Sequence, residues 1–232
     1  NLLRDGADII DIGGESSRPG ADTISILEES ERVLPLIAKL LEYDPNMVIS
    51  VDTTKAEIAE QSLKIGAKII NDISGFDYDS NMMSILEKYK PIVILMHTKG
   101  NPKTMQNNPS YSDVISEIYD YFVEKINKLN NIGVNKIILD PGIGFGKRVE
   151  DNFEIINRLE DFHSLGYPIL IGLSKKSFLG KTTDSDVMDR DFESVIMETL
   201  SVNNGAKFIR THNVKNANKI KKLLTKYQNY GG

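Results

Sequence analysis

Polar side chains follow a series of short apolar runs, and their types suit a binding site. Asp and Asn side chains offer oxygen acceptors and an amide, which suit a flat heterocycle with several N–H donors and a carbonyl. Arg18, Arg210 and His212 offer donors for an anion, so the expected ligand is a heterocycle that carries phosphate. The residues that follow the runs are Gly13–Gly20, Asp52-Thr53, Asn71-Asp72, Met96-His97, Asp140-Pro141-Gly142, Gly172–Lys176 and Arg210–Asn213.

The apolar runs predict strands, and amphipathic stretches between them predict helices. The runs are short, rich in Ile and Val, and do not alternate with polar residues, which is typical of strands buried on both faces of a parallel sheet. Gly66, Gly133 and Gly205 each stand between a helix and a strand, where a helix C-cap belongs. The predicted strands are Asp8–Ile12, Met47–Val51, Lys68–Asn71, Ile92–Met96, Lys136–Leu139, Ile169–Gly172 and Lys207–Arg210. The predicted helices are Ile26–Leu41, Lys55–Lys64, Tyr111–Leu129, Phe192–Asn203 and Asn216–Tyr227, with Asp52-Thr53-Thr54 as the N-cap of the second.

Strict alternation of strand and helix predicts an α/β fold, either an open doubly wound sheet or a TIM (β/α)8 barrel. Asn1–Asp5 reads like the end of a helix, which implies a preceding strand. We therefore expect a barrel whose first strand is missing from this chain, formed as one domain over residues 1–232. In such barrels the carboxyl ends of the strands form a ring around the active site, so the polar residues above would converge.

Composition excludes several classes of function. The 232 residues carry a net charge of −5, which argues against a nucleic-acid or membrane-surface partner. There is no cysteine, which excludes disulfides and thiolate metal sites and is compatible with a cytoplasmic enzyme. No apolar run is long enough to span a membrane. With three His and no Cys, a zinc site is not expected, and any metal would be Mg²⁺ held mainly by substrate phosphates and water.

Seven motifs, taken in order along nearly the whole chain, resemble the dihydropteroate synthase family of pterin-binding barrels. A single short motif such as Val-Asp-Thr is weak evidence for the family, whereas the Met-His…Met-Gln and Ser-Lys-Lys-Ser-Phe segments are more specific to it. The motifs are Asp11–Ala21, Val51-Asp52-Thr53, Asn71–Ser74, Met96–Gln106, Asp140–Lys147, Gly172–Phe178 and Arg210–Val214.

The resemblance implies a role for each matching residue. The implied pterin-binding residues are Asp52, Asn71, Met96, Asp140, Phe145, Gly172 and Lys176. Arg210 and His212 match a pyrophosphate-binding pair, and these two with Asp52, Asp140 and Lys176 form the implied catalytic set. The implied p-aminobenzoate-binding residues are Ser17, Arg18, Pro19, Lys176 and Ser177.

The implied reaction joins 6-hydroxymethyl-7,8-dihydropterin pyrophosphate to p-aminobenzoate, with Mg²⁺ as cofactor, and releases pyrophosphate. An SN1-like pterin cation, a homodimer and inhibition by sulfonamides are also implied. The chain departs from the family pattern at Lys99, Lys175, Thr211 and Asn213. Nothing here matches the family's first-strand motif, whose Asn links the protein to Mg²⁺, so no metal ligand is expected within this chain. Without that strand, catalysis is expected to be weak or lost.

Each residue also has a simpler interpretation. Asp52 could cap a helix, Asp140 could form a turn, Asn71 could satisfy loop backbone groups, and Lys176 could be solvated. His97 is as well explained by a structural hydrogen bond as by chemistry. Two other functions stay open: a pterin-binding methyltransferase-type barrel, and a non-catalytic pterin-binding fragment.

Overall fold

Strands and helices alternate along the computed structural model, which describes residues 2–16, 21–100, 105 and 109–229. Within these residues every predicted strand is present, shifted by at most two residues at either end. The strands are β1 (Ile10–Gly13), β2 (Ile49–Asp52), β3 (Ile69–Asp72), β4 (Ile92–Met96), β5 (Ile137–Asp140), β6 (Leu170–Gly172) and β7 (Phe208–Arg210).

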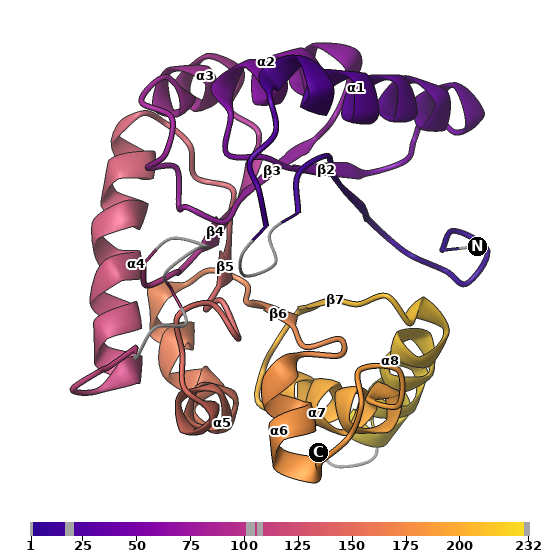
Figure 1. Cartoon of the computed structure of the whole chain (residues 1–232), viewed down its shortest axis with the longest axis vertical. Helices are drawn as coiled ribbons and strands as arrows, with labels where there is room; N and C mark the ends of the chain where they lie inside the picture. Colours follow the sequence, from indigo (N-terminus) through magenta and orange to yellow (C-terminus); the bar gives the residue numbers. More distant parts are fainter. Residues whose placement is uncertain (1, 17–20, 101–104, 106–108, 230–232) are drawn as a thin grey trace.

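Helices cover the outer side of the strands, as Figure 1 shows. The helices are α1 (Ile26–Tyr43), α2 (Ala56–Ile65), α3 (Met82–Tyr89), α4 (Val114–Asn131), α5 (Val149–Asn157), α6 (Ser177–Thr183), α7 (Asp191–Asn203) and α8 (Val214–Gln228), with a 3-10 helix, η1 (Leu159–Leu165), after α5. All five predicted helices are confirmed, whereas α3, α5, α6 and η1 were not predicted. In the described part of the chain, none of the helices is long and apolar enough to cross a membrane.

The strands are parallel and follow one another in chain order, which is the topology of the predicted TIM barrel. β1 to β5 form one sheet, β6 pairs with β7, and a parallel bridge between Leu139 and Ile169 joins the two groups. Among the described residues β1 and β7 have no pairing between them, so the ring of strands is open there (Figure 1).

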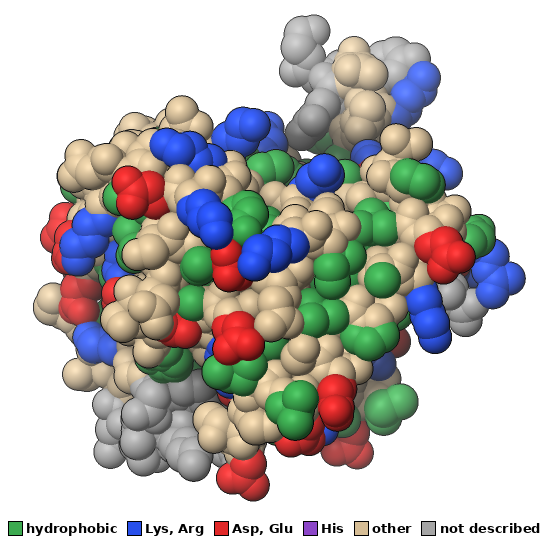
Figure 2. Space-filling model, turned by 90° about the horizontal axis from the view of Figure 1, so that it is seen from above, with side chains coloured by type: hydrophobic (Ala, Val, Ile, Leu, Met, Phe, Trp, Pro, Cys, Tyr) green, Lys and Arg blue, Asp and Glu red, His purple; other side chains and the backbone are tan. Residues whose placement is uncertain are grey.

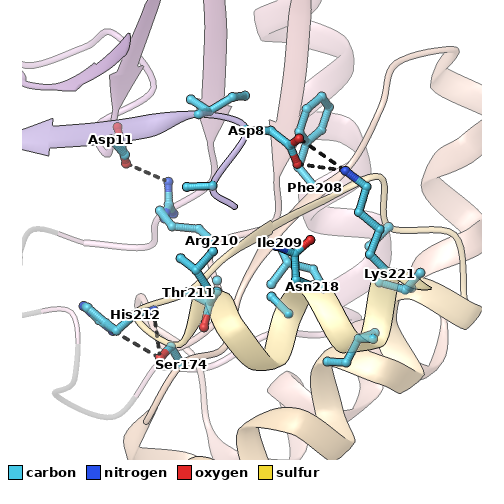
Figure 3. Close-up of a pocket in the computed structure, with 18 of the residues that line it drawn as sticks. Asp8, Asp11, Ser174, Phe208, Ile209, Arg210, Thr211, His212, Asn218 and Lys221 are labelled. Atoms are coloured by element: carbon cyan, nitrogen blue, oxygen red, sulfur yellow. Dashed lines mark hydrogen bonds and ion pairs between the residues drawn. The ribbon is translucent and has the colours of Figure 1, made fainter. Parts of the chain in front are cut away.

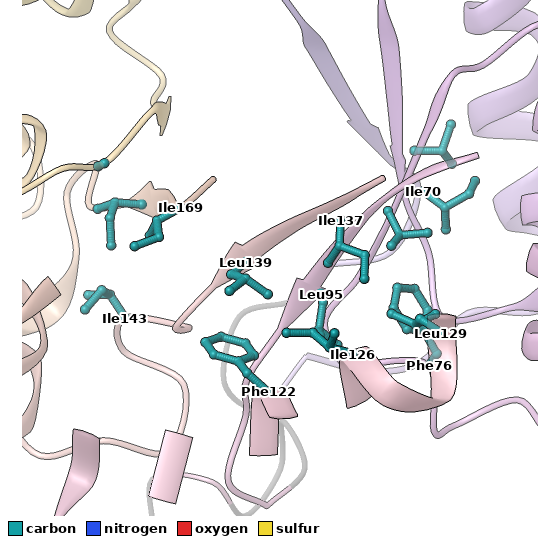
Figure 4. Close-up of a cluster of buried hydrophobic side chains, with 14 of the residues drawn as sticks. Ile70, Phe76, Leu95, Phe122, Ile126, Leu129, Ile137, Leu139, Ile143 and Ile169 are labelled. Carbon is teal, nitrogen blue, oxygen red and sulfur yellow. The ribbon is translucent and has the colours of Figure 1, made fainter. Parts of the chain in front are cut away.

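Alternate residues of the strands contact different surroundings, which explains the continuous apolar runs. Ile69, Ile94 and Ile138 pack with other strand residues inside the barrel. Their neighbours Ile70, Leu95 and Leu139 pack instead against the helices. Figure 4 shows this outer layer, in which Phe122 and Leu129 of α4 meet strand side chains such as Leu139, Leu95 and Ile137. Burying each such side chain contributes roughly 1.5–3 kcal/mol, so this double layer fixes the strands that carry the site.

Helix ends follow the sequence in most places. Gly66, Gly133 and Gly205 have φ of 127°, 76° and 101°, a conformation that favours glycine, and the prediction of glycine C-caps is confirmed. The predicted N-cap of α2 is wrong: the cap position is Lys55, and the carboxylate of Asp79 accepts the Ala56 N–H at 2.8 Å. The predicted helix end at the start of the chain is confirmed, because residues 2–6 form turns: the Gly6 N–H donates to the Leu3 carbonyl at 3.0 Å and the Ala7 N–H to the Leu2 carbonyl at 3.1 Å, the bonds of a glycine C-cap.

Charged side chains of both signs are interspersed over the face seen in Figure 2. Lys and Arg side chains are more numerous in the upper half of this view, and Asp and Glu side chains in the lower half.

Candidate active site

Strand register brings the predicted site residues to one edge of the sheet. Gly13 pairs with Asp52, and Asp52 pairs in turn with Asn71. Met96 pairs with Asp140, and Gly172 pairs with Arg210. The prediction that residues distant in sequence converge at the carboxyl ends of the strands is therefore confirmed. The bridge at Leu139 and Ile169 connects the two groups of strand ends.

A cavity of 830 Å³ opens at these strand ends and continues along the gap between β1 and β7. Figure 3 shows Asp11, Arg210, Thr211 and His212 around it. Of the predicted site residues, those that line the cavity are Asp52, Phe145, Gly172, Lys176, Arg210 and His212. Asn71, Met96 and Asp140 do not line it, because each is buried behind this layer with at most 1% of its surface exposed.

Arg210 lies between two carboxylates at the opening of the barrel. Its Nη2 donates to Asp140 Oδ2 at 2.5 Å, and its Nη1 lies 3.7 Å from Asp11 Oδ2. Asp140 also accepts the Gly142 N–H at 2.8 Å through Oδ1, which is the turn-forming role of the simpler interpretation. Asp140 therefore shapes the loop after β5, and Arg210 covers its remaining oxygen.

Asn71 has an acceptor without a protein donor. Its Nδ2 donates to Asp11 Oδ2 at 3.3 Å, whereas its Oδ1 is buried and has no hydrogen-bond partner in the described part of the chain. An unpaired buried polar atom costs about 1–3 kcal/mol, and a ligand N–H would relieve that cost. The alternative role, hydrogen bonding to loop backbone, is absent from the described contacts of this side chain.

The pKa of Asp52 is raised to about 7. Burial is the main cause, and the negative charge of Asp11 on the neighbouring strand adds to it, while Arg210 opposes both. Both effects penalise the carboxylate form. A donor or a positive charge in the cavity would favour ionisation of Asp52, as expected for a group that binds a cationic or N–H-rich ring.

Lys176 and Phe145 form one wall of the cavity. The Nζ of Lys176 lies 4.4 Å from the centroid of the Phe145 ring, a cation–π distance. Burial, followed by repulsion from Arg210, lowers the pKa of Lys176 to about 8. Phe145 packs behind with Met96, Met105 and Ile73, so the apolar part of the wall is continuous.

His212 is exposed and contacts the Ser174 hydroxyl through its backbone N–H and its ring. The His212 N–H donates to Ser174 Oγ at 3.3 Å, and its Nδ1 lies 3.1 Å from the same oxygen (Figure 3). Ser177, the first residue of α6, is exposed and does not line the cavity. Ser17, Arg18 and Pro19 lie outside the described residues.

Sequence reasoning missed three residues of the site. Asp11 contacts both Asn71 and Arg210, but it stands inside an apolar run rather than after it, so its position gave a weaker signal. Ser174 holds His212 and lies within a predicted segment without being singled out. Lys147 is buried, and it is the last residue of the motif Asp140–Lys147, in which no role was assigned to it.

Comparison with known proteins identifies related sequences. The family model described as pterin binding enzyme matches residues 1–212. The chain is 42% identical over 217 residues to the dihydropteroate synthase of Synechocystis sp., an alignment that covers 92% of this chain and 75% of that protein.

Solved structures share the fold. The dihydropteroate synthase of Yersinia pestis, solved in a sulfonamide complex, is 35% identical with a TM-score of 0.95, and the match covers 98% of this chain and 83% of that one. The enzyme of Xanthomonas albilineans, solved with 4-aminobenzoic acid, is 33% identical with a TM-score of 0.91, covering 98% of this chain and 81% of that one.

Proposed function

The chain belongs to the dihydropteroate synthase family of pterin-binding enzymes, and we propose that it condenses 6-hydroxymethyl-7,8-dihydropterin pyrophosphate with p-aminobenzoate. The products are 7,8-dihydropteroate and pyrophosphate. As a member of this family it is a transferase of folate biosynthesis. The observation that carries the proposal is the strand register, which sets Asp52, Asn71 and Asp140 close to Arg210 at one edge of the sheet.

The pterin ring is assigned to the space in front of Asp52, Asn71 and Asp140. Two carboxylates and one amide can accept the ring's N–H groups and donate to its carbonyl, and the unpaired Asn71 Oδ1 supports this assignment. Lys176 and Phe145 would enclose the ring from the side of the cavity wall. Asp140 becomes available to the ring only when Arg210 leaves its carboxylate.

The pyrophosphate group is assigned to Arg210 and His212. The C–O bond to the pterin methylene breaks, its electron pair leaves with pyrophosphate, and the amine lone pair of p-aminobenzoate forms the new C–N bond. The amine proton then passes to pyrophosphate or water. Asp52 and Asp140 would stabilise positive charge on the pterin while Arg210 and His212 stabilise the departing anion, which is electrostatic catalysis at both developing charges.

The p-aminobenzoate site is assigned to Lys176, Ser177 and the loop residues Ser17, Arg18 and Pro19. Ser177 is exposed and begins α6 directly after Lys176, a residue that lines the cavity, which supports this assignment. The Xanthomonas albilineans relative was solved with 4-aminobenzoic acid, and the Yersinia pestis relative in a sulfonamide complex. Sulfonamides are accordingly proposed to inhibit this enzyme by competing with p-aminobenzoate.

Mg²⁺ is proposed to enter with the substrate. Over residues 2–16, 21–100, 105 and 109–229, no group of three or more His, Asp or Glu side chains could hold an ion. Pyrophosphate oxygens and water are the ligands that Mg²⁺ prefers, and the bound ion would neutralise charge on the leaving group. Product formation at rising Mg²⁺ concentration, with substrate fixed, should level off when the pyrophosphate is saturated with the ion; a rate that ignores Mg²⁺ contradicts this.

A homodimer is proposed, with the outer face of α7 as its interface. Phe192, Ile196 and Leu200 recur every four residues along this helix and expose 73%, 42% and 46% of their surface. Such a row of large apolar side chains is a candidate protein contact. Analytical ultracentrifugation should give twice the chain mass for the unmodified protein and the mass of one chain for Phe192→Glu.

The cytoplasmic location stays a prediction, which cell fractionation would test.

The test of the proposed reaction is product formation measured by mass spectrometry, with both substrates and Mg²⁺. Dihydropteroate should appear only when pterin pyrophosphate and p-aminobenzoate are both present, and Asp140→Asn should reduce its rate by at least about tenfold. Binding of the pterin without any product would favour a non-catalytic pterin-binding protein and contradict the proposal.

A further inference from the structure

Lys147 is a buried lysine without an acidic partner. It exposes 3% of its surface, and in the described part of the chain no carboxylate lies within 4 Å of its Nζ. Its contacts are His97 Nδ1 at 3.0 Å, the Phe145 carbonyl at 3.1 Å and the His97 carbonyl at 3.4 Å. An ammonium group has three N–H donors, and here three acceptors surround it.

The surroundings make this lysine costly to keep. Burial is the main cause that lowers its pKa to about 7; the like charges of Lys176 and Lys99 add to it, and Asp140 and Asp151 oppose it. Burial and the charge of Lys147 also lower the pKa of His97 well below its ordinary value, so the ring is neutral and its Nδ1 can accept. An apolar side chain at this position would avoid the cost of burying a charge. The hydrogen bonds of Lys147 must therefore provide something that an apolar side chain could not.

Lys147 stands where two loops touch through their backbones. A Cβ atom at Gly142 would lie 1.9 Å from the His97 carbonyl oxygen, and one at Gly146 would lie 2.2 Å from the Lys99 carbonyl oxygen. The segment after β4, residues 97–99, therefore rests directly on the glycine-rich loop after β5, residues 142–146. Carbonyl groups from both segments converge on the Nζ of Lys147.

We propose that Lys147 is a positioning residue for the pterin site, which fixes Phe145 by joining the loop after β5 to the segment after β4. Phe145 is the residue whose carbonyl Lys147 binds and whose ring faces Lys176 across the cavity wall. Movement of this loop would displace the apolar wall from the ring. The inference rests on the proposed function, because it assumes that the pterin lies against Phe145.

Lys147→Met tests the inference because methionine fills similar space and cannot donate. Calorimetry with 6-hydroxymethylpterin should show binding at least about tenfold weaker, and the KM for p-aminobenzoate should change less than about twofold. Lys147→Gln keeps two donors and should bind with intermediate affinity. It also serves if the methionine variant does not fold.

Lys125→Met is the matched control. Lys125 is also buried, with 7% exposed, and donates to a loop carbonyl, that of Gly75, at 2.9 Å; unlike Lys147, it also forms an ion pair with Asp77. Lys125→Met should lower the melting temperature, as Lys147→Met should, but it should leave pterin affinity within about twofold of the unmodified chain.

A double-mutant cycle separates positioning from a general structural role. If Lys147 acts through Phe145, adding Lys147→Met to Phe145→Ala should weaken pterin binding no further. Additive losses, or pterin affinity unchanged while the melting temperature falls, would overturn the inference. Absence of pterin binding by the unmodified chain would overturn the proposed function and this inference with it, whereas the other outcomes bear on Lys147 alone.

Discussion

Replacing Arg210 by methionine should change the affinities of two related ligands in opposite directions. In the structure Arg210 binds the carboxylate of Asp140, the group assigned to the pterin, at 2.5 Å. A pterin must displace the guanidinium from Asp140 before it can use that carboxylate. When a pterin pyrophosphate binds, the displaced guanidinium binds the pyrophosphate, and this offsets the free energy lost with the Arg210–Asp140 ion pair. A pterin without pyrophosphate has no anion for the guanidinium, so the loss is not offset.

The magnitudes follow from burial and bonding. Asp140 is 1% exposed and Arg210 is 29% exposed, so the pair lies between a surface ion pair and a fully buried one and contributes about 1–2 kcal/mol. Arg210→Met should therefore strengthen binding of 6-hydroxymethylpterin by about 5- to 30-fold. For the pyrophosphate ester the same gain of about 1–2 kcal/mol offsets part of the lost hydrogen bonds to a charged group, about 1.5–3 kcal/mol, so the ester should bind about 2- to 5-fold more weakly.

Calorimetry with the two ligands, at one pH and salt concentration, measures both effects. His212→Ala is the control, because His212 is exposed and bonded to Ser174, away from Asp140. It should weaken the pyrophosphate ester and leave 6-hydroxymethylpterin unchanged. Arg210→Met that weakens both ligands equally would refute the reasoning, since Arg210 would then contact the pterin itself rather than compete with it.

Three further predictions concern charge and backbone geometry. Asp52 must ionise to bind the ring, and the charge of Asp11 helps to raise the pKa of Asp52 to about 7. Asp11→Asn removes that charge, so the rising limb of the kcat/KM–pH profile should move to lower pH; a limb that does not move contradicts this. Lys55→Met should lower the free energy of unfolding by about 3 kcal/mol at pH 7, because Lys55 holds two glutamates at 2.5 and 2.6 Å; denaturant titration measures this, and an unchanged free energy of unfolding would contradict it. Gly142→Ala should lower the free energy of unfolding by about 3 kcal/mol or more, because its Cβ would collide with the His97 backbone. Gly166→Ala has a similar positive φ but open space around its Cβ, and should lower the free energy of unfolding by about 1 kcal/mol. Similar losses for the two variants would show that the backbone contact at Gly142 does not matter.

The strands could be predicted because burial on both faces makes their apolar runs continuous. Residues such as Ile69 and Ile70 point to opposite sides and are both buried, so the pattern differs from any solvated element. Strand order then places the strand ends together, and the convergence of Asp52, Asn71 and Asp140 follows from sequence alone.

Short helices could not be predicted from local pattern. α6 has seven residues and contains Gly180 and two Thr, which are poor helix formers, so its helical form depends on the burial of Phe178 and Leu179. α3 has eight residues and no side-chain hydrogen bond at its N-cap. Tertiary packing decides both, and a single sequence contains no direct signal of it.

The contacts among site residues were also beyond sequence reasoning. Arg210 was predicted to bind an anion, but its bond to Asp140 depends on side chains that are 70 positions apart. Lys147 gave no signal either, because a lysine that follows glycines suggests solvent or phosphate and not burial against His97.

A crystal structure with bound 6-hydroxymethylpterin tests the proposed pterin site most directly. We expect the ring at the carboxyl ends of β2, β3 and β5, within hydrogen-bond distance of Asp52, Asn71 and Asp140, with Arg210 displaced from Asp140. A ring bound elsewhere, or bound while Arg210 still holds Asp140, would contradict it.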